Sequence, residues 1–140
     1  MFEIGYTTGV FDLFHAGHMA YLKQVKSYCN FLVVGICSDD LVIQLKNRKP
    51  IFSEKNRMEI ISGIKVVDYS FIKHTTDKLQ DWHKYHFNAV FHGDQEAKNR
   101  FHEIENRKRL EPYGVKFIYF DRDYKLSTTK YIDYIRKETR

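Results

Sequence analysis

Two hydrophobic patterns alternate along the chain: continuous apolar runs, and apolar positions spaced three or four residues apart. Continuous apolar runs are typical of parallel strands that are covered on both faces, and the wider spacing is typical of amphipathic helices. The predicted strands are Phe2–Thr8, Phe31–Ser38, Val66–Ile72, Ala89–His92 and Val115–Phe120. The predicted helices are His18–Tyr28, a helix opened by Ser53, Asp77–His86 and Ser127–Lys137, with Glu96–Leu110 as a polar helix or an ordered loop.

Strands and helices in strict alternation predict an α/β fold. We expect a single domain over residues 1–140, built on a doubly wound parallel five-stranded sheet with helices on both faces. In such sheets ligands bind beyond the carboxyl ends of the strands. The loops at that edge are Thr8–His18, Ser38–Lys55, Gly93–Lys98 and Asp121–Thr129. The functional residues are expected in these loops.

Composition and charge narrow the class of protein. The 140 residues are 43% hydrophobic and 29% charged, as in ordinary globular domains. A net charge of +5 favours anionic partners but does not identify them. The segment Lys98–Arg109 carries charges of both signs and is predicted to be a solvated helix face. The two cysteines fit neither zinc nor redox spacing, which favours a reducing compartment. With no signal peptide and no apolar run of about 20 residues, a cytoplasmic protein without membrane insertion is expected.

The first strand-end loop carries the most informative motif. His15 and His18 flank Gly17, where the first strand gives way to a helix. The start of a helix offers free N–H groups and a partial positive charge, both of which suit phosphate. Glycine lets the backbone approach a ligand closely, and two imidazoles can donate hydrogen bonds to phosphate oxygens. The pattern predicts a phosphate site, and its simpler alternative is a pair of incidental loop histidines.

Motifs spread over nearly the whole chain resemble those of the cytidylyltransferase family of HxGH nucleotidyltransferases. The stretch Gly9–His18 matches the pattern G-x-F-D-x-x-H-x-G-H, and Arg122–Thr129 is the counterpart of the second signature, R-T-E-G-I-S-T-T. Further matches are Lys46–Pro50, Glu54, Arg57 and Gly93–Asp94. The length and layout are most similar to the glycerol-3-phosphate cytidylyltransferases.

This resemblance implies a Rossmann-like nucleotidyltransferase fold, a reaction and its partners. CMP would pass from CTP to a small phosphorylated alcohol, expected to be glycerol 3-phosphate, giving CDP-glycerol and pyrophosphate for a surface polymer such as teichoic acid or capsule. A phosphate monoester is largely dianionic at neutral pH, so it needs no general base. A divalent ion, expected to be Mg2+, would bridge the phosphates with few protein ligands. The resemblance also implies a homodimer.

The resemblance assigns roles to individual residues. The expected catalytic residues are His15, His18, Lys46 and Arg122. The expected nucleotide-binding residues are Val10, Phe11, His15, Gly17, His18, Arg48, Asp94, Arg122, Ser127, Thr128 and Thr129. The expected acceptor-binding residues are Lys46, Lys78 and Asp12. Simpler roles stay open for several of these: a solvated loop for Lys46 and Arg48, a loop brace for Asp12, and a helix N-cap for Ser127.

Departures from the family pattern keep alternatives open. Lys65 stands where glycerol-3-phosphate enzymes carry arginine, and Ala16 stands where they often carry tryptophan. Lysine and arginine bind phosphate differently. The alternatives are CMP transfer to choline phosphate or ethanolamine phosphate, and AMP transfer to a sugar phosphate. A nucleic-acid-binding module would instead show a basic stripe with exposed aromatic residues. Because the informative basic residues fall in strand-end loops, no nucleic acid partner is expected.

Overall fold

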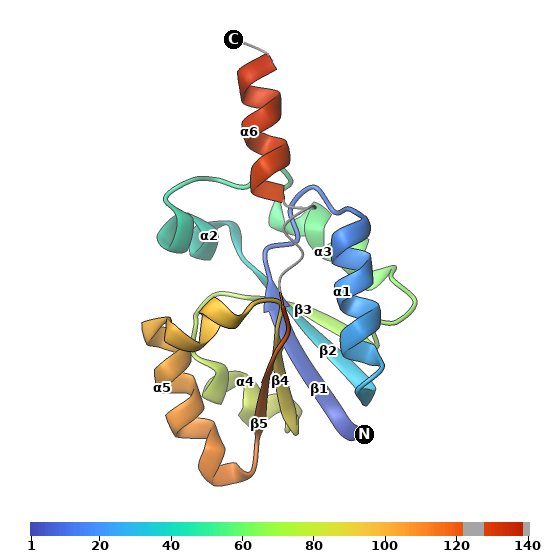
Figure 1. Cartoon of the computed structure of the whole chain (residues 1–140), viewed down its shortest axis with the longest axis vertical. Coiled ribbons are helices and arrows are strands. Elements are labelled where there is room, and N and C mark those ends of the chain that lie inside the picture. The colour runs from blue at the N-terminus through green and yellow to red at the C-terminus, as the bar shows by residue number, and fades with distance from the viewer. Residues whose placement is uncertain (122–127, 139–140) are drawn as a thin grey trace.

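The computed structural model describes residues 1–121 and 128–138 (Figure 1). The strands are β1 (Phe2–Gly9), β2 (Cys29–Cys37), β3 (Tyr69–Lys73), β4 (Ala89–His92) and β5 (Lys116–Tyr119). The helices are α1 (Ala16–Lys26), α2 (Asp39–Lys46), α3 (Glu54–Ser62), α4 (Lys78–Tyr85), α5 (Phe101–Leu110) and α6 (Thr128–Glu138). Short 3-10 turns cover Gln95–Asn99 and Glu111–Tyr113.

The five strands form one sheet in the order β3-β2-β1-β4-β5, and every neighbouring pair is parallel. The chain winds outward from β1 to β3, then crosses back to add β4 and β5 on the other side of β1. The winding therefore reverses between β1 and β4, and a ligand crevice is expected at the carboxyl ends of these two strands. The predicted doubly wound parallel sheet is confirmed.

Helices cover both faces of the sheet (Figure 1), and alternate residues of the strands feed two cores, one on each face. The first core gathers side chains of β2 with those of α1 and α3: Leu32, Val34, Ile36, Leu22, Val25 and Ile61. The second core joins β1, β2 and β4 to the α4 and α5 side: Tyr6, Val33, Val90, Phe87 and Leu110. Burying each of these large side chains contributes roughly 1.5–3 kcal/mol. The two cores fix the strand ends on which the site is built.

Helix α2 occupies part of the segment that the sequence predicted as a loop over Ser38–Lys55, so that prediction is wrong for its first half. Ser38 caps the helix by accepting a hydrogen bond from the amide of Leu41 at 3.2 Å. Ile43 and Leu45 are 42% and 46% exposed, so apolar residues lie on the outer side of this helix as well as on its buried side. The helical spacing of its apolar positions is therefore not visible in the sequence. The helix ends at Lys46, with Asn47 in the left-handed conformation as its C-cap. Lys46 is therefore held on a helix end rather than in a long loop.

Two further boundaries differ from prediction. Strand β3 begins at Tyr69 rather than at the predicted Val66, because Val66 and Val67 lie in a turn and pack against the first core. The segment Glu96–Leu110 is a 3-10 turn followed by α5, separated at Arg100, whose backbone is extended. Glu103 and Asn106 are 1% and 3% exposed, so the prediction of a solvated helix face over Lys98–Arg109 is wrong at these two positions. Within the described residues, no helix has the length and apolar character needed to cross a membrane.

Candidate active site

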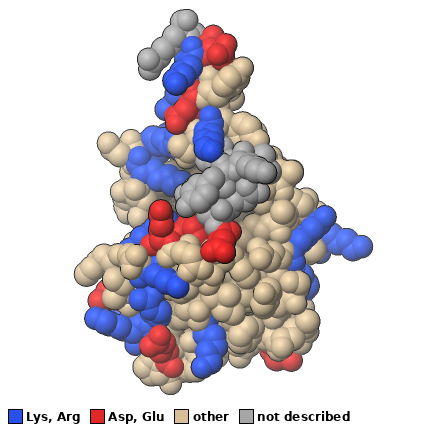
Figure 2. Space-filling model, viewed as in Figure 1, with Lys and Arg blue, Asp and Glu red and all other residues tan. Residues whose placement is uncertain are grey.

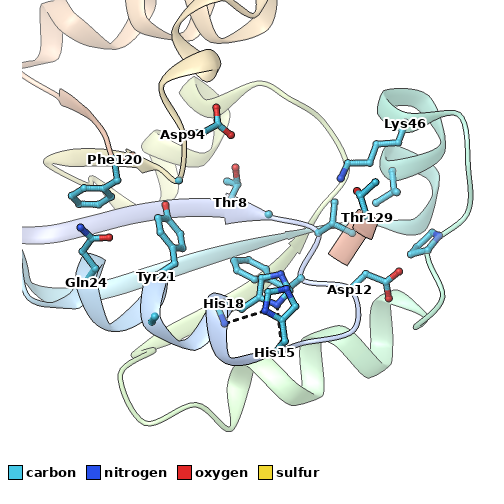
Figure 3. A pocket seen from close by; sticks show the side chains of 18 of the residues that line it. Thr8, Asp12, His15, His18, Tyr21, Gln24, Lys46, Asp94, Phe120 and Thr129 are labelled. Carbon is cyan, nitrogen blue, oxygen red and sulfur yellow. Dashed lines mark hydrogen bonds between the residues drawn. The ribbon is translucent and has the colours of Figure 1, made fainter. Parts of the chain in front are cut away.

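A cavity of about 410 Å³ opens at the carboxyl ends of β1 and β4 (Figure 3). The predicted site residues that line it are Val10, Phe11, Asp12, His15, Gly17, His18, Lys46, Arg48, Asp94 and Thr129. They come from four separate segments of the chain, which the sheet topology brings to one edge. This is the crevice that the reversal of strand order creates.

The two histidines of the motif are locked together at the start of α1. His15 is the N-cap, and its Nδ1 accepts a hydrogen bond from the amide of Gly17 at 3.0 Å. The amide of His15 donates to Nδ1 of His18 at 3.1 Å. A neutral imidazole whose Nδ1 accepts must carry its proton on Nε2. Each ring therefore offers an Nε2–H donor, and the stacked rings lie 3.9 Å apart between centroids.

Burial keeps both histidines neutral at pH 7. It lowers the pKa of His15 from its ordinary value of 6.5. Burial, reinforced by the adjacent His15, lowers the pKa of His18 to about 4. Nε2 of His15 is buried and has no hydrogen-bond partner among the described residues. A buried donor without a partner costs about 1–3 kcal/mol, so this atom is poised for an acceptor oxygen on a ligand.

The loop before the histidines has an unusual backbone. Phe11 and Leu13 adopt positive φ angles of 54° and 48°, a conformation that residues with side chains rarely take. Asp12 stabilises this turn, because its carboxylate accepts hydrogen bonds from three amides: Leu13 at 3.1 Å, Ile51 at 2.7 Å and Phe52 at 2.8 Å. Asp12 thus braces the first loop against the segment after α2. Its role in acceptor binding stays a prediction.

Arg57 is a site residue to which the sequence assigned no role. Its side chain is fully buried and its guanidinium donates to the carbonyls of Val10 at 2.9 Å, Cys37 at 2.7 Å and Phe52 at 3.0 Å. It also pairs with Asp39 at 2.7 Å. The guanidinium therefore joins the loop after β1 and the segment before α3 to the end of β2. Arginine is rarely buried, so its polar helical setting in the sequence did not reveal this role.

One side of the cavity is basic. Lys46 ends α2, and Nη2 of Arg48 donates to Oγ1 of Thr129 in α6 at 3.2 Å. Figure 3 shows Lys46 and Thr129 on the same side of the cavity. Arg122 and Ser127, as well as the side chain of Thr128, lie outside the described residues. Lys46, Arg48 and Thr129 of the predicted phosphate-binding set thus gather at this basic side.

The opposite side is aromatic and was not predicted. Tyr21, Gln24 and Phe120 line it (Figure 3). The hydroxyl groups of Tyr21 and Thr7 share a hydrogen bond of 2.7 Å, which holds the phenol ring as part of the cavity wall. Asp94 lines the cavity as well, and its carboxylate caps the following 3-10 turn. Aromatic rings and an amide make this side suited to a planar heterocycle.

Lys78 does not line this cavity. Its ammonium group is buried and pairs with Glu103, whose other carboxylate oxygen lies 2.5 Å from Nε2 of His92. Burial lowers the pKa of Lys78. Burial alone would raise the pKa of Glu103, but the bond from His92 and the charge of Lys78 hold it well below its usual range. The geometry makes Lys78 part of a buried charge network and does not support its predicted contact with the acceptor.

The described residues contain no group of three or more His, Cys, Asp or Glu side chains arranged to hold a metal ion. Magnesium commonly needs only one or two carboxylates when substrate phosphates and water complete its coordination. The Mg2+ that the resemblance implies stays a prediction.

A doubly wound parallel sheet with a histidine-capped helix at its switch-point cavity is the arrangement expected of the HxGH nucleotidyltransferase fold. The chain belongs to the cytidylyltransferase-like family, whose model matches residues 6–134. A solved structure supports the fold: the chain is similar to the lipopolysaccharide core biosynthesis protein from Thermoplasma volcanium GSS1, with 29% identity and a TM-score of 0.73. That match covers 88% of this chain and 99% of the other.

Curated relatives match the chain over about half its length. It is 44% identical over 68 residues to the bifunctional protein HldE of Helicobacter pylori (strain HPAG1), which is 48% of this chain and 15% of HldE. It is 38% identical over 78 residues to the HldE of Hyphomonas neptunium (strain ATCC 15444), which is 55% of this chain and 16% of that protein. The matched segments are thus a small part of these longer relatives.

Proposed function

We propose that this protein transfers a nucleoside monophosphate from a nucleoside triphosphate to the phosphate of a small phosphorylated polyol or sugar. The observation that carries the proposal is the pair of neutral imidazoles at the start of α1, each with its proton on Nε2. They line a cavity whose volume of about 410 Å³ suits a small ligand.

CTP is the proposed donor, because the matching family is cytidylyltransferase-like. Glycerol 3-phosphate is the acceptor that the sequence motifs favour. The likeness to a lipopolysaccharide core biosynthesis protein favours a sugar phosphate instead. Both acceptors present the same reacting group, a phosphate dianion on a hydroxylated carbon skeleton, so one mechanism serves for either.

In the proposed reaction, an oxygen of the acceptor phosphate attacks the α-phosphorus of the nucleotide. A new P–O bond forms there while the bond to the bridging β-phosphate oxygen breaks, and pyrophosphate leaves with the electron pair. The attacking dianion gives up no proton. Catalysis then depends on positioning and on stabilising charge that develops on the phosphate oxygens. His15 and His18 would donate their Nε2–H groups to those oxygens.

The two sides of the cavity fit the two ends of such a complex. Tyr21, Gln24 and Phe120 would receive the base, through ring contacts and the amide. Lys46 would hold the acceptor phosphate, and Arg48 would approach the triphosphate. Mg2+ would be held mainly by the phosphates and would neutralise part of their charge. Asp94 is one of three aspartates that line the same cavity, with Asp12 and Asp121.

A nucleic-acid-binding function is the alternative from another class. Figure 2 shows Lys and Arg side chains interspersed with Asp and Glu on the face that carries α5, without a continuous basic stripe there. A non-specific nucleic-acid groove needs a continuous positive track with stacking aromatic residues. The arrangement on this face supports the enzymatic proposal.

A pyrophosphate-release assay tests the proposal. CTP, ATP, UTP and GTP are each combined with glycerol 3-phosphate, sugar phosphates, choline phosphate and ethanolamine phosphate, with Mg2+ present. We expect release with CTP and a polyol or sugar phosphate, and loss of release in His18→Ala. A higher kcat/KM with ATP would reassign the donor to an adenylyl group. Release with none of the pairs would contradict the proposed activity.

A further inference from the structure

Helix α6 meets the body of the protein at its N-terminal end and projects away from it (Figure 1). Ile132 is 4% exposed, whereas Tyr134 and Ile135 further along are 64% and 51% exposed. In the part of the chain that the structure describes, at least two contacts join this end of α6 to the cavity. One is the hydrogen bond from Arg48 to Thr129. The other is a ring contact between Tyr131 and His15, with centroids 5.4 Å apart and planes at 69°.

The contact with Tyr131 completes the surroundings of the His15 ring. The amide of Gly17 fixes the place of Nδ1, but a single hydrogen bond leaves a ring free to tilt about it. His18 stacks on one side of the ring, with centroids 3.9 Å apart and planes at 25°. Tyr131 meets the ring edge-to-face, the geometry that aromatic pairs prefer besides offset stacking. Together the two rings restrict the tilt that decides where the Nε2–H bond points.

We propose that Tyr131 is a positioning residue, which holds the imidazole of His15 in the orientation that aims Nε2–H into the cavity and shields that ring from water. The aromatic ring does this, and the hydroxyl group is not needed. Tyr131 stands after the Ser127–Thr129 motif, so none of the motifs that marked the site includes it. The part of the proposal that concerns catalysis rests on the proposed nucleotidyl transfer, while the part that concerns the His15 ring does not.

NMR titration of the histidine rings tests the contact without any substrate. The His15 and His18 resonances are followed separately, because the two rings are the nearest titratable neighbours of each other. In Tyr131→Ala the pKa of His15 should rise toward its ordinary value of about 6.5, since water replaces the ring. Tyr131→Phe should titrate like the natural protein. The matched control is Tyr134→Ala, which removes an exposed tyrosine from the same helix and should change nothing.

Steady-state kinetics form the second arm. Tyr131→Ala should lower kcat roughly three- to tenfold, the scale of one lost aromatic pair, with a smaller change in KM for the nucleotide. Tyr131→Leu keeps apolar bulk without a ring, so it separates ring orientation from simple helix docking. In Tyr131→Leu we expect the pKa of His15 and kcat to differ from those of the natural protein. In Tyr131→Phe we expect both to match the natural protein.

Two results would overturn the positioning role. One is a Tyr131→Ala protein with the natural His15 titration, and the other is full restoration of both readouts by Leu. If the natural protein shows no transferase activity, the proposed function fails, and the NMR arm still decides the contact between Tyr131 and His15.

Discussion

The amide of His15 donates a hydrogen bond to Nδ1 of His18, 3.1 Å away, within the first turn of α1. This bond and its counterpart from Gly17 to His15 cap the helix and at the same time set the tautomer of both rings. A single local motif thus stabilises a helix end and supplies two neutral donors. Changes to either histidine should therefore affect stability as well as chemistry.

His18→Ala is expected to lower kcat by roughly two to three orders of magnitude, as when one transition-state donor is lost. It should also destabilise the fold by about 1 kcal/mol, because part of the helix cap is lost. His18→Asn, which keeps a side-chain acceptor but no Nε2–H, should recover stability without recovering kcat. Kinetics and urea unfolding measure the two effects, with exposed His83→Ala as the unaffected control. A well-folded His18→Asn with near-normal kcat would refute the donor role.

The low pKa of His18 predicts a pH dependence of stability. Its folded pKa of about 4 lies below the ordinary 6.5, so between these values the unfolded chain binds more protons than the folded one. Stability should rise with pH across this window and fall as the solution is acidified from 6.5 toward 4. Urea unfolding at several pH values gives the slope of the free energy of unfolding against pH. In His18→Asn this slope should be shallower, by an amount equivalent to up to about one bound proton. An unchanged slope would show that His18 titrates normally.

Lys46→Ala should raise KM for the phosphorylated acceptor by roughly ten- to a hundredfold, since one charge-assisted hydrogen bond contributes about 1.5–3 kcal/mol. KM for the nucleotide should change less. The matched control is Lys49→Ala, which removes an exposed charge from the following segment and does not line the cavity. Varying each substrate in turn measures both constants. Equal behaviour of the two variants would mean that Lys46 belongs to a solvated charge run.

Lys78→Met should act on stability rather than on acceptor binding. It leaves the carboxylate of Glu103 without one of its two partners in a buried site, a change that costs about 3–5 kcal/mol. The double variant Lys78→Met/Glu103→Gln should recover part of that loss, and KM for the acceptor should stay near its natural value in both. Urea unfolding and kinetics give the two readouts. A large rise in acceptor KM without loss of stability would restore the acceptor role.

The sheet and most of the cavity were predictable because their patterns are local. Continuous apolar runs indicated the strands. Histidine, glycine and basic residues that follow these runs indicated the loops that meet at one edge of the sheet. The His15–His18 pair was found this way, as was the basic end of α2. The homodimer, Mg2+ and the roles of Arg122 and Ser127 remain predictions from resemblance.

The features that sequence reasoning missed depend on tertiary contacts. Helix α2 is short, and its exposed Ile43 and Leu45 break the usual two-sided pattern. Burial of Arg57 follows largely from the carbonyl groups of Val10 and Cys37, which lie on distant segments and which no local spacing encodes. Similarly, the pairing of Lys78 with Glu103, 25 residues away, depends on the fold, so the sequence alone did not show it. The contact of Tyr131 with His15 spans almost the whole chain.

The most direct test of the central claim is 31P NMR of the products formed from CTP and the acceptor that reacts best in the screen. Nucleotidyl transfer predicts a pyrophosphate-linked product with two coupled phosphorus signals, together with an equal amount of inorganic pyrophosphate. His18→Asn should form both far more slowly. Formation of CDP with a newly phosphorylated acceptor, or of CMP and pyrophosphate alone, would contradict transfer of a nucleoside monophosphate to the acceptor phosphate.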